Sequence, residues 1–267
     1  MRSALSCTPA TLGRRSVLFL GAGATLCACG PQHALPDPNR AQLTAAQQTI
    51  AAAGPLRRTE RARSEQVAML RRVAGRVAEA NDPLCREYNG QGCRFRIGLV
   101  QDESPNAFAT DNNLVGVTSG MLEIVDSDAE LAAVLAHEFG HHLAQHIQRA
   151  GTRTQLGGLA GALVGAYLGG GALAQVGQQV GGGAARLAYS QAEEREADYL
   201  AAFMVNRAGY DLAEAGGIWV RLGQAAGRSD QPSFLRTHPT GPERLAAWQR
   251  TVGEIRAAGP NALPRRA

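Results

Sequence analysis

The spacing of apolar residues along the chain predicts a helix, then a small sheet, then a longer helical region. Four apolar residues between 59 and 80 recur at steps of three and four positions: Val67, Leu70, Val73 and Val77. This period predicts an amphipathic helix whose outer face is rich in arginine. The sequence Asn-Asp-Pro at 81–83 should stop that helix, because proline cannot continue the helical hydrogen-bond ladder.

Alternating residues then predict three short strands. The stretch "RFRIGLV" places three apolar residues on one face, as in a half-buried strand: Phe95, Ile97 and Leu99. The segments "NAFAT" at 106–110 and "NLVGVTSG" at 113–120 predict two more strands around a polar Asp-Asn-Asn turn. We therefore expect a small antiparallel sheet ahead of the next helix.

That next helix contains four ionisable side chains in an otherwise apolar stretch, "LAAVLAHEFGHHLAQ" at 131–145. Ser127 and Glu130 have the spacing of a capping box, which predicts the start of the helix. Gly151 is its expected end. Burying groups that can carry charge is costly unless a partner satisfies them, so the stretch needs a partner.

The pattern His-Glu-x-x-His identifies that partner. His137 and His141 lie one turn apart, about 40° from each other around the helix axis, with Glu138 beside them. Two imidazoles one turn apart can bind one Zn²⁺. Glu138 would point past the metal and could take a proton from a water that the metal activates. We therefore predict one Zn²⁺ per chain.

An acidic segment downstream offers a third ligand. "YSQAEEREADYLA" places Glu194 and Asp198 four residues apart, on one face of a predicted helix. Glu194 can complete a site of two His and one Glu with a fourth position open. Asp198 can accept the outer N–H of a ligand histidine. We interpret the other charges of this segment as a solvated face: Glu193, Arg195 and Glu196.

Residues 1–28 have the pattern of an export signal. Two arginines precede the apolar run "VLFLGAGATLCA", which is too short to span a membrane. Leu-Cys-Ala-Cys at 26–29 resembles a bacterial lipobox, in which cleavage leaves Cys29 as a lipidated N-terminus. An ordinary secretory signal cleaved nearby is the alternative, and the match to a twin-arginine signal is weak. We expect residues 29–55, which include "GPQHALPDPN", to form a flexible tether.

Cysteine usage and charge narrow the class of protein. Besides Cys29, only Cys85 and Cys93 remain after the signal, and in an exported chain such a pair predicts a disulfide. A metal pair is the weaker alternative, because no other Cys or His cluster lies near them in sequence. The net charge is only +4 and the arginines are scattered, so the sequence does not predict nucleic-acid binding.

Together, "HEFGH" and "SQAEEREAD" resemble the HtpX-like and CaaX-prenyl-endopeptidase family of gluzincin metallopeptidases. Four residues match the family's second motif, Ser-Arg-x-x-Glu-x-x-Ala-Asp: Ser190, Glu194, Ala197 and Asp198. Gln191 stands where the family has Arg. "GVTSGML" and "THPTGPERL" are similar to further family segments, and the likeness over about 59–249 is closest to small exported lipoprotein or Oma1-like members. The resemblance implies a zinc endopeptidase with Glu194, not the neighbouring acids, as third ligand.

The resemblance also implies a second donor that stabilises the developing oxyanion. His238, in a Pro-flanked loop, and Arg244 after it are the candidates. His238 could instead bind zinc as a fourth ligand and hold the enzyme latent, or lie in a surface loop away from the site. We interpret His142 and His146, on other faces of the helix, as structural or supporting residues.

We expect a predominantly α-helical α+β fold, with a zincin-like metallopeptidase domain over 56–258 and a C-terminal tail over 259–267. An edge strand could bind an extended polypeptide by β-augmentation, and an ordinary sheet strand is the alternative. The residues that would form it are Asn106, Ala107, Phe108 and Ala109. Glycines repeat every fourth residue from 157 to 169, within a segment over 154–185 that has no charged residue. This spacing favours a small-residue helical hairpin or flap near the active site, with membrane insertion as the alternative.

These features predict an endopeptidase of the bacterial cell envelope, on the periplasmic side and attached to the outer membrane by lipid on Cys29. Its expected substrates are misfolded or unassembled envelope polypeptides. A homo-oligomer or outer-membrane assembly partners are left open. Two alternatives are a zinc-dependent holdase and a structural lipoprotein whose zinc stabilises the fold. An intact Glu138 argues against the holdase, and structural zinc sites usually have four protein ligands.

Overall fold

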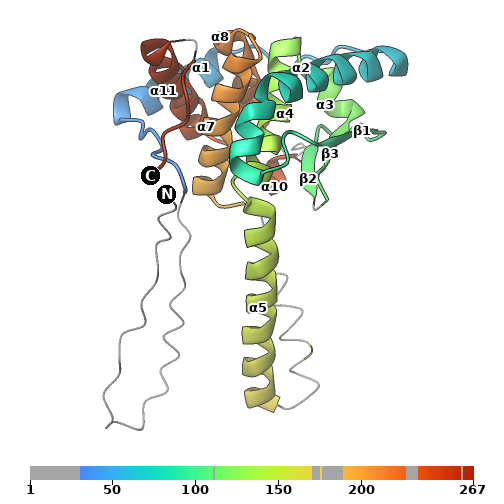
Figure 1. The fold of residues 1–267 in the computed structure, drawn as a ribbon, viewed down its shortest axis with the longest axis vertical. Helices are drawn as coiled ribbons and strands as arrows, with labels where there is room; N and C mark the ends of the chain where they lie inside the picture. Colours follow the sequence, from blue (N-terminus) through green and yellow to red (C-terminus); the bar gives the residue numbers. More distant parts are fainter. Residues whose placement is uncertain (1–30, 111, 170–174, 176–188, 227–233, 260) are drawn as a thin grey trace.

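A computed structural model of the chain describes residues 31–110, 112–169, 175, 189–226, 234–259 and 261–267. In this part of the chain, helices surround a central helix and a small sheet lies at one side (Figure 1). The predicted export signal and the lipidation site at Cys29 lie outside the described residues, as do residues 170–174 and 176–185 of the hairpin or flap predicted over 154–185.

The first predicted helix is longer than expected. Helix α2 spans Arg63–Asn89 and contains Pro83, so the stop predicted at 81–83 is wrong. The apolar face continues past the proline, and Leu84 and Cys85 are buried. Burial of that face offsets the one backbone hydrogen bond that proline removes. The helix ends at Gly90, whose φ of 73° lies in the left-handed region that glycine adopts without strain.

The three predicted strands are present, but the sheet is mixed and not antiparallel. Strands β1 (Arg96–Val100), β2 (Ala107–Thr110) and β3 (Leu114–Thr118) lie in the order β1-β3-β2. β2 and β3 pair antiparallel as predicted, whereas β1 pairs parallel with β3. β1 thus lies on the side of β3 that is opposite β2 and runs in the same direction as β3. The alternating pattern predicts each strand but not which neighbour it will have.

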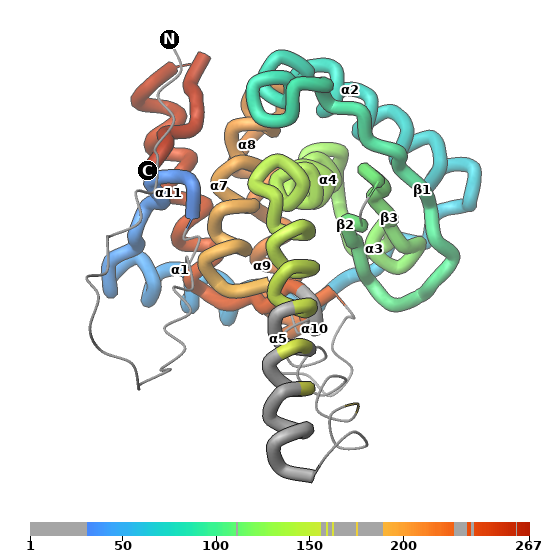
Figure 2. The backbone as a smooth tube through the Cα atoms, turned by 60° about the horizontal axis from the view of Figure 1, so that its bottom comes forward, coloured from blue at the N-terminus to red at the C-terminus, as the bar shows by residue number. Residues whose placement is uncertain are grey.

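Helix α4 spans Asp128–Leu143 and begins at Ser127, whose hydroxyl accepts from the Glu130 N–H at 3.3 Å. It ends eight residues before the expected end at Gly151. Gln145, with φ of 59°, breaks the helix, and α5 (His146–Gly169) continues through Gly151. Between β3 and α4 lies the short helix α3 (Ser119–Ile124). α4 lies at the centre of the body (Figure 2), and its apolar residues are almost all buried.

α7 (Gln191–Arg207) packs along α4 more extensively than any other helix. Gly140 of α4 makes this possible, because a Cβ there would lie 2.9 Å from the carbonyl oxygen of Ala197. Helices α8 (Leu212–Ala215), α9 (Gly217–Ala225), α10 (Phe234–Thr237) and α11 (Pro242–Ala258) complete the body. Trp219 and Trp248 fill the space between α9 and α11.

The expected flexible tether at 29–55 is wrong for its described part. Helix α1 (Arg40–Ala52) forms there and packs on α11 and α9. Asn39 caps it in a capping box with Gln42, and the helix buries Ala46. The expected tail at 259–267 is also fixed, because Arg266 pairs with His33 in a β-bridge and Ala262 is buried. Short polar segments of this kind carry little apolar periodicity, so their order comes from contacts distant in sequence.

Two other predictions concern the cysteine pair and the glycine-rich segment. Cys85 and Cys93 face one another with their Cα atoms 5.1 Å apart, within the range of a disulfide. The oxidation state of the pair in the cell stays a prediction. α5 extends away from the body (Figure 1). No helix in the described part of the chain combines the length and the apolarity needed to cross a bilayer.

Candidate metal centre

Two helices and one loop bring four candidate metal ligands together. α4 supplies His137 and His141, α7 supplies Glu194, and the loop after α10 supplies His238. Each side chain is 0 or 1 % exposed, and one ligand atom from each lies within 4.8 Å of all the others. Sequence spacing predicted the first three as ligands, and His238, whose role the sequence left open, lies in the same group.

Four distances within this group are close to those between ligands of a single metal ion. His137 Nε2 lies 3.1 Å from His141 Nε2 and 3.2 Å from His238 Nδ1. Glu194 Oε1 lies 3.0 Å from His238 Nδ1 and 3.4 Å from His141 Nε2. Ligands held about 2.0–2.1 Å from a tetrahedral zinc ion lie about 3.3 Å from one another. The four side chains therefore fit a single cation of this size.

A carboxylate fixes the orientation of the first ligand. His137 Nδ1 lies 2.8 Å from Asp198 Oδ1, which leaves Nε2 to face the centre. This is the role predicted for Asp198. Although burial lowers the pKa of His137, its hydrogen bond to Asp198 and the nearby Glu194 raise it to about 9. Metal binding would therefore displace a proton from His137.

Arg244 holds the two carboxylates behind the centre. Its Nε and one terminal nitrogen each lie 2.7 Å from an oxygen of Asp198, and its other terminal nitrogen lies 2.8 Å from Glu194 Oε2. Burial raises the pKa of Glu194, but the charges of His238 and Arg244 lower it well below the usual range. The guanidinium also stacks 4.3 Å over the ring of Trp219. All three of its nitrogens are engaged, so these contacts favour a positioning role over the predicted oxyanion donor.

The second ligand is oriented by another histidine. His141 Nδ1 lies 2.9 Å from His146 Nδ1, and His146 Nε2 lies 3.0 Å from Glu196 Oε2. Burial lowers the pKa of His141 well below its usual range, so its imidazole is neutral, as a metal ligand must be. The break at Gln145 turns His146 back beneath His141. The supporting role predicted for His146 thus fits its position.

Glu138 has an unusual environment for a carboxylate. Its side chain is fully buried, and neither oxygen has a hydrogen-bond partner among the described residues. His238 Nε2 lies 3.7 Å from Glu138 Oε1. Burial raises the pKa of Glu138 above its ordinary value. An unpartnered buried carboxylate costs several kcal/mol, so this position demands a reason beyond packing.

A comparison with known families gives that reason. The model of peptidase family M48 matches residues 45–252, which is most of the chain. The chain belongs to peptidase family M48. A metallopeptidase site of this kind needs two histidine ligands and a general-base Glu on one helix, and a ligand Glu on a second helix. The family resemblance drawn from the two sequence motifs is confirmed.

Individual relatives agree with the family assignment. The chain is 30% identical to mitochondrial metalloendopeptidase OMA1 of Arabidopsis thaliana over 154 residues, 58% of this chain and 31% of that protein. It is 29% identical to OMA1 of Saccharomyces cerevisiae over 196 residues, 67% of this chain and 55% of that protein. It is 29% identical to the beta-barrel assembly-enhancing protease of Escherichia coli K12 over 208 residues, 70% of this chain and 43% of that protein. The chain thus spans less than two thirds of each of these relatives.

Within this M48 chain, the acidic segment of α7 differs from its prediction. Glu193 and Glu196 were expected on a solvated face, yet both are buried. Glu193 pairs with Arg153 of α5 at 2.6 Å. Glu196 accepts from His33 as well as from His146, and His33 lies in the expected tether. Sequence spacing missed these residues because their partners lie 40 to 163 positions away.

Tyr189 is a further site residue that the sequence analysis missed. Its ring stacks on the His141 imidazole, with centroids 3.9 Å apart and planes inclined by 28°. It also lies 5.3 Å from the ring of His238. Burial and the charges of Glu138 and Glu194 raise its pKa. Its place directly before Ser190, the N-cap of α7, is the only sequence signal that could have pointed to it.

The predicted substrate strand lies where expected, at one edge of the sheet. Ala107, Phe108 and Ala109 belong to β2, which pairs on one side only, with β3. Asn106 precedes β2, and its backbone N–H donates to Thr118 Oγ1 at 2.8 Å. β2 also packs beside α4. Polypeptide binding along this edge stays a prediction.

Proposed function

We propose that the protein is a zinc-dependent endopeptidase in which Glu138 is the general base. The observation that carries this proposal is a buried Glu138 carboxylate, without a hydrogen-bond partner among the described residues, beside a group of three imidazoles and one carboxylate. A ligand set of imidazoles and one carboxylate is typical of zinc sites in peptidases. The ligand atoms lie 3.0 to 3.2 Å from their neighbours, which supports binding of a single ion.

When bound, zinc would supply Lewis acidity to the scissile carbonyl and to the attacking water. Glu138 accepts the proton that the water loses and carries it to the leaving amine. Its place beside the metal ligands, within 3.7 Å of His238 Nε2, suits both steps. Asp198 and Arg244 keep His137 and Glu194 in place during the reaction.

His238 determines whether the centre is open. Its Nδ1 is placed as the fourth corner of the ligand group, and its Nε2 faces Glu138. In this arrangement His238 takes the position that a substrate or water needs, which supports the latent state over the transition-state role. A cavity of about 370 Å³ borders Glu194 and Arg244 on one side and residues 239–243 on the other. Movement of that loop would withdraw His238 and join the cavity to the centre.

We further propose that the substrates are misfolded or unassembled polypeptides of the cell envelope. The name of the Escherichia coli relative, beta-barrel assembly-enhancing protease, supports an envelope role. The edge strand β2 supports recognition of extended backbone, because β-augmentation depends on main-chain hydrogen bonds and not on particular side chains. Attachment of the chain to the outer membrane through Cys29, and a homo-oligomer or assembly partners there, belong to the same proposal.

Two rival functions use the same metal group without hydrolysis. A structural zinc site usually closes with four protein ligands, and His238 supplies a fourth. A zinc-dependent holdase would bind unfolded polypeptides and release them intact. Neither rival needs a carboxylate at position 138, and a buried carboxylate without partners would only destabilise the fold.

Metal content and proteolysis distinguish these functions. We would purify the full chain in mild detergent as wild type, Glu138→Gln and His238→Ala, count zinc per chain, and measure cleavage of unfolded casein. We expect one zinc in each protein and a loss of cleavage of at least about 10³-fold in Glu138→Gln, the scale of losing a general base or more. His238→Ala should cleave faster than wild type if His238 closes the centre. Zinc binding without cleavage by any of the three would favour the rivals, and wild type without zinc would refute the metal site.

A further inference from the structure

We propose that His33 is a positioning residue for the metal ligand His141, acting through Glu196 and His146. The segment at 31–35 would then hold the metal centre from outside the region that the M48 family model matches, which begins at residue 45. This inference rests on the proposed function, because it requires His141 to bind zinc. It adds a residue, and a segment, that neither the motifs nor the relatives assign to the centre.

A continuous row of buried contacts connects His33 to the metal group. His33 Nδ1 lies 2.7 Å from Glu196 Oε1, and the other oxygen, Oε2, lies 3.0 Å from His146 Nε2. His146 Nδ1 lies 2.9 Å from His141 Nδ1, and His141 Nε2 faces the centre. His33, Glu196, His146 and His141 are each at most 2 % exposed, so water does not compete for these contacts.

The chemistry of the carboxylate sets the direction of every hydrogen bond in the row. An ionised Glu196 can only accept, so His33 and His146 both donate to it. His146 then has an unprotonated Nδ1, which accepts the Nδ1–H of His141. His141 keeps its lone pair on Nε2, where the metal group needs it. The row thus fixes the tautomer of His141, as Asp198 fixes that of His137 in one step.

His33 matters to this row because it donates one of the hydrogen bonds that Glu196 Oε1 accepts. The backbone N–H of Gln32 donates to the same oxygen at 2.5 Å. Without the segment at 31–35, Glu196 would lose both donors and keep a buried charge with one oxygen unpaired. That state is costly, and the carboxylate would turn away from His146 or admit water. After either change, the tautomer and the orientation of the His141 ring would no longer be fixed.

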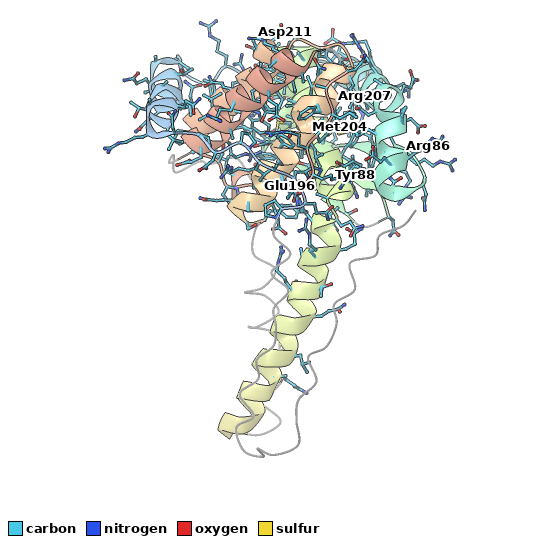
Figure 3. The ribbon with its side chains drawn as sticks, turned by 60° about the vertical axis from the view of Figure 1, so that its left-hand side comes forward. Arg86, Tyr88, Glu196, Met204, Arg207 and Asp211 are labelled. Atoms are coloured by element: carbon cyan, nitrogen blue, oxygen red, sulfur yellow. A yellow bond between two sulfur atoms is a disulfide. The ribbon has the colours of Figure 1, made fainter. Side chains whose placement is uncertain are left out.

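Contacts with the other end of the described chain hold His33 in position. Tyr88 Oη lies 2.6 Å from His33 Nε2, and Arg266 stacks 4.0 Å over the Tyr88 ring. Arg266 also pairs with His33 in the β-bridge, and the Ala34 N–H donates to the Arg265 carbonyl at 3.0 Å. Glu196 and Tyr88 both lie on the side of the body from which α5 extends (Figure 3). The segment at 31–35 therefore acts as a clamp closed by residues 265–267.

Two substitutions of His33 separate hydrogen bonding from packing. His33→Phe keeps an aromatic ring but removes the N–H to Glu196, whereas His33→Asn supplies an amide N–H near the position of Nδ1. In the full chain, zinc affinity would be measured by competition with a chelator, alongside thermal unfolding of the metal-free proteins. Loss of a residue that hydrogen-bonds a ligand directly costs 10- to 100-fold in metal affinity. His33 acts two residues further away, so we expect a loss of about three- to tenfold in His33→Phe, with most of it recovered in His33→Asn.

Hydrogen exchange on the wild type gives a second measurement that needs no variant. Coupling between two sites is reciprocal, so zinc should slow exchange of the Gln32 amide about as much as the clamp strengthens zinc binding. We expect at least threefold slower exchange at Gln32 with zinc, and no change at exposed amides of α1. Equal zinc affinity in wild type and a folded His33→Phe, equal losses in both variants, or no zinc effect at Gln32 would each overturn the proposal. If wild type binds no zinc at all, the proposed function fails first.

Discussion

Helices α4 and α5 are separated by only two residues, yet they are built for opposite environments. α4 is buried over most of its length, and its His137, Glu138 and His141 lie at the metal group. α5 begins at the buried His146 and then leaves the body, with Gly151 and Thr152 exposed. Both have helical sequences, so helix formation alone does not distinguish them. The difference is in what each helix must lie against.

The glycines of the two helices show this most clearly. Gly140, next to the ligand His141, lets α4 approach α7 until a Cβ would lie 2.9 Å from the Ala197 carbonyl oxygen. Nothing lies within 4 Å of a Cβ at Gly151. A glycine in α4 is therefore a packing requirement of the metal centre, whereas a glycine in α5 only lowers helix propensity.

Removal of the metal should give the largest difference between the two helices, because the stability of α4 depends on the ion and that of α5 does not. A ligand held at 1,000 times its Kd stabilises the folded state by about 4 kcal/mol. We expect a chelator to lower the free energy of unfolding by at least that order, and to speed hydrogen exchange in α4 and α7. Exchange in α5 beyond Gly151 should not change. Equal acceleration in both helices would show that they form one cooperative unit.

The second effect acts at the junction of the two helices. Burial raises the pKa of Glu196, but hydrogen bonds from His146 and His33 outweigh this and lower it from 4.5 to about 2. A lowered pKa stabilises the folded state above pH 4.5, and the contribution is lost as pH falls towards 2. For metal-free protein this is at most about 3 kcal/mol. Glu196→Gln should therefore unfold with a flatter pH dependence between 4.5 and 2, measured by urea denaturation at each pH. An unchanged slope would mean that other carboxylates cause the acid unfolding.

The smallest expected effect compares the two glycines directly. Gly140→Ala should destabilise the fold by about 1–3 kcal/mol, because the backbone of α7 must move to accept the methyl group. The same movement separates His141 from Glu194, so zinc affinity should fall as well. Gly151→Ala is the matched control, and should leave zinc affinity unchanged while stabilising α5 by about 0.5–1 kcal/mol. Denaturation curves and zinc titrations of both variants test the pair. A harmless Gly140→Ala would refute the close packing of α4 on α7.

Local patterns in the sequence predicted more of the centre than of the fold around it. His137, Glu138 and His141 share one helical turn, and Glu194 and Asp198 share another, so spacing alone placed each set on one face. Strand positions followed from alternation in the same way. These features depend on residues within a few positions of each other, which is the range over which periodicity is informative.

The features that were missed depend on distant contacts. Glu196 looked like a surface acid because nothing near it in sequence indicates His33, which lies 163 positions away. The parallel pairing of β1 with β3 depends on where two strands meet, not on either strand's pattern. Helix α1 has few large apolar residues and owes its order to capping and to packing on α11. Tertiary contacts outweighed local propensity in all three cases.

The bridge between His33 and Arg266 has a practical consequence for anyone who shortens the chain. Arg40, where the first helix begins, is an obvious place to start an expressed fragment, and Ala258, where the last helix ends, is an obvious place to stop. Such a fragment would keep every residue of the two peptidase motifs. It would also lose both strands of the bridge and leave Glu196 without the donors at its first oxygen. Poor zinc retention by that fragment would then reflect the trimming and not the native protein, and a bulky affinity tag fused next to either strand carries the same risk.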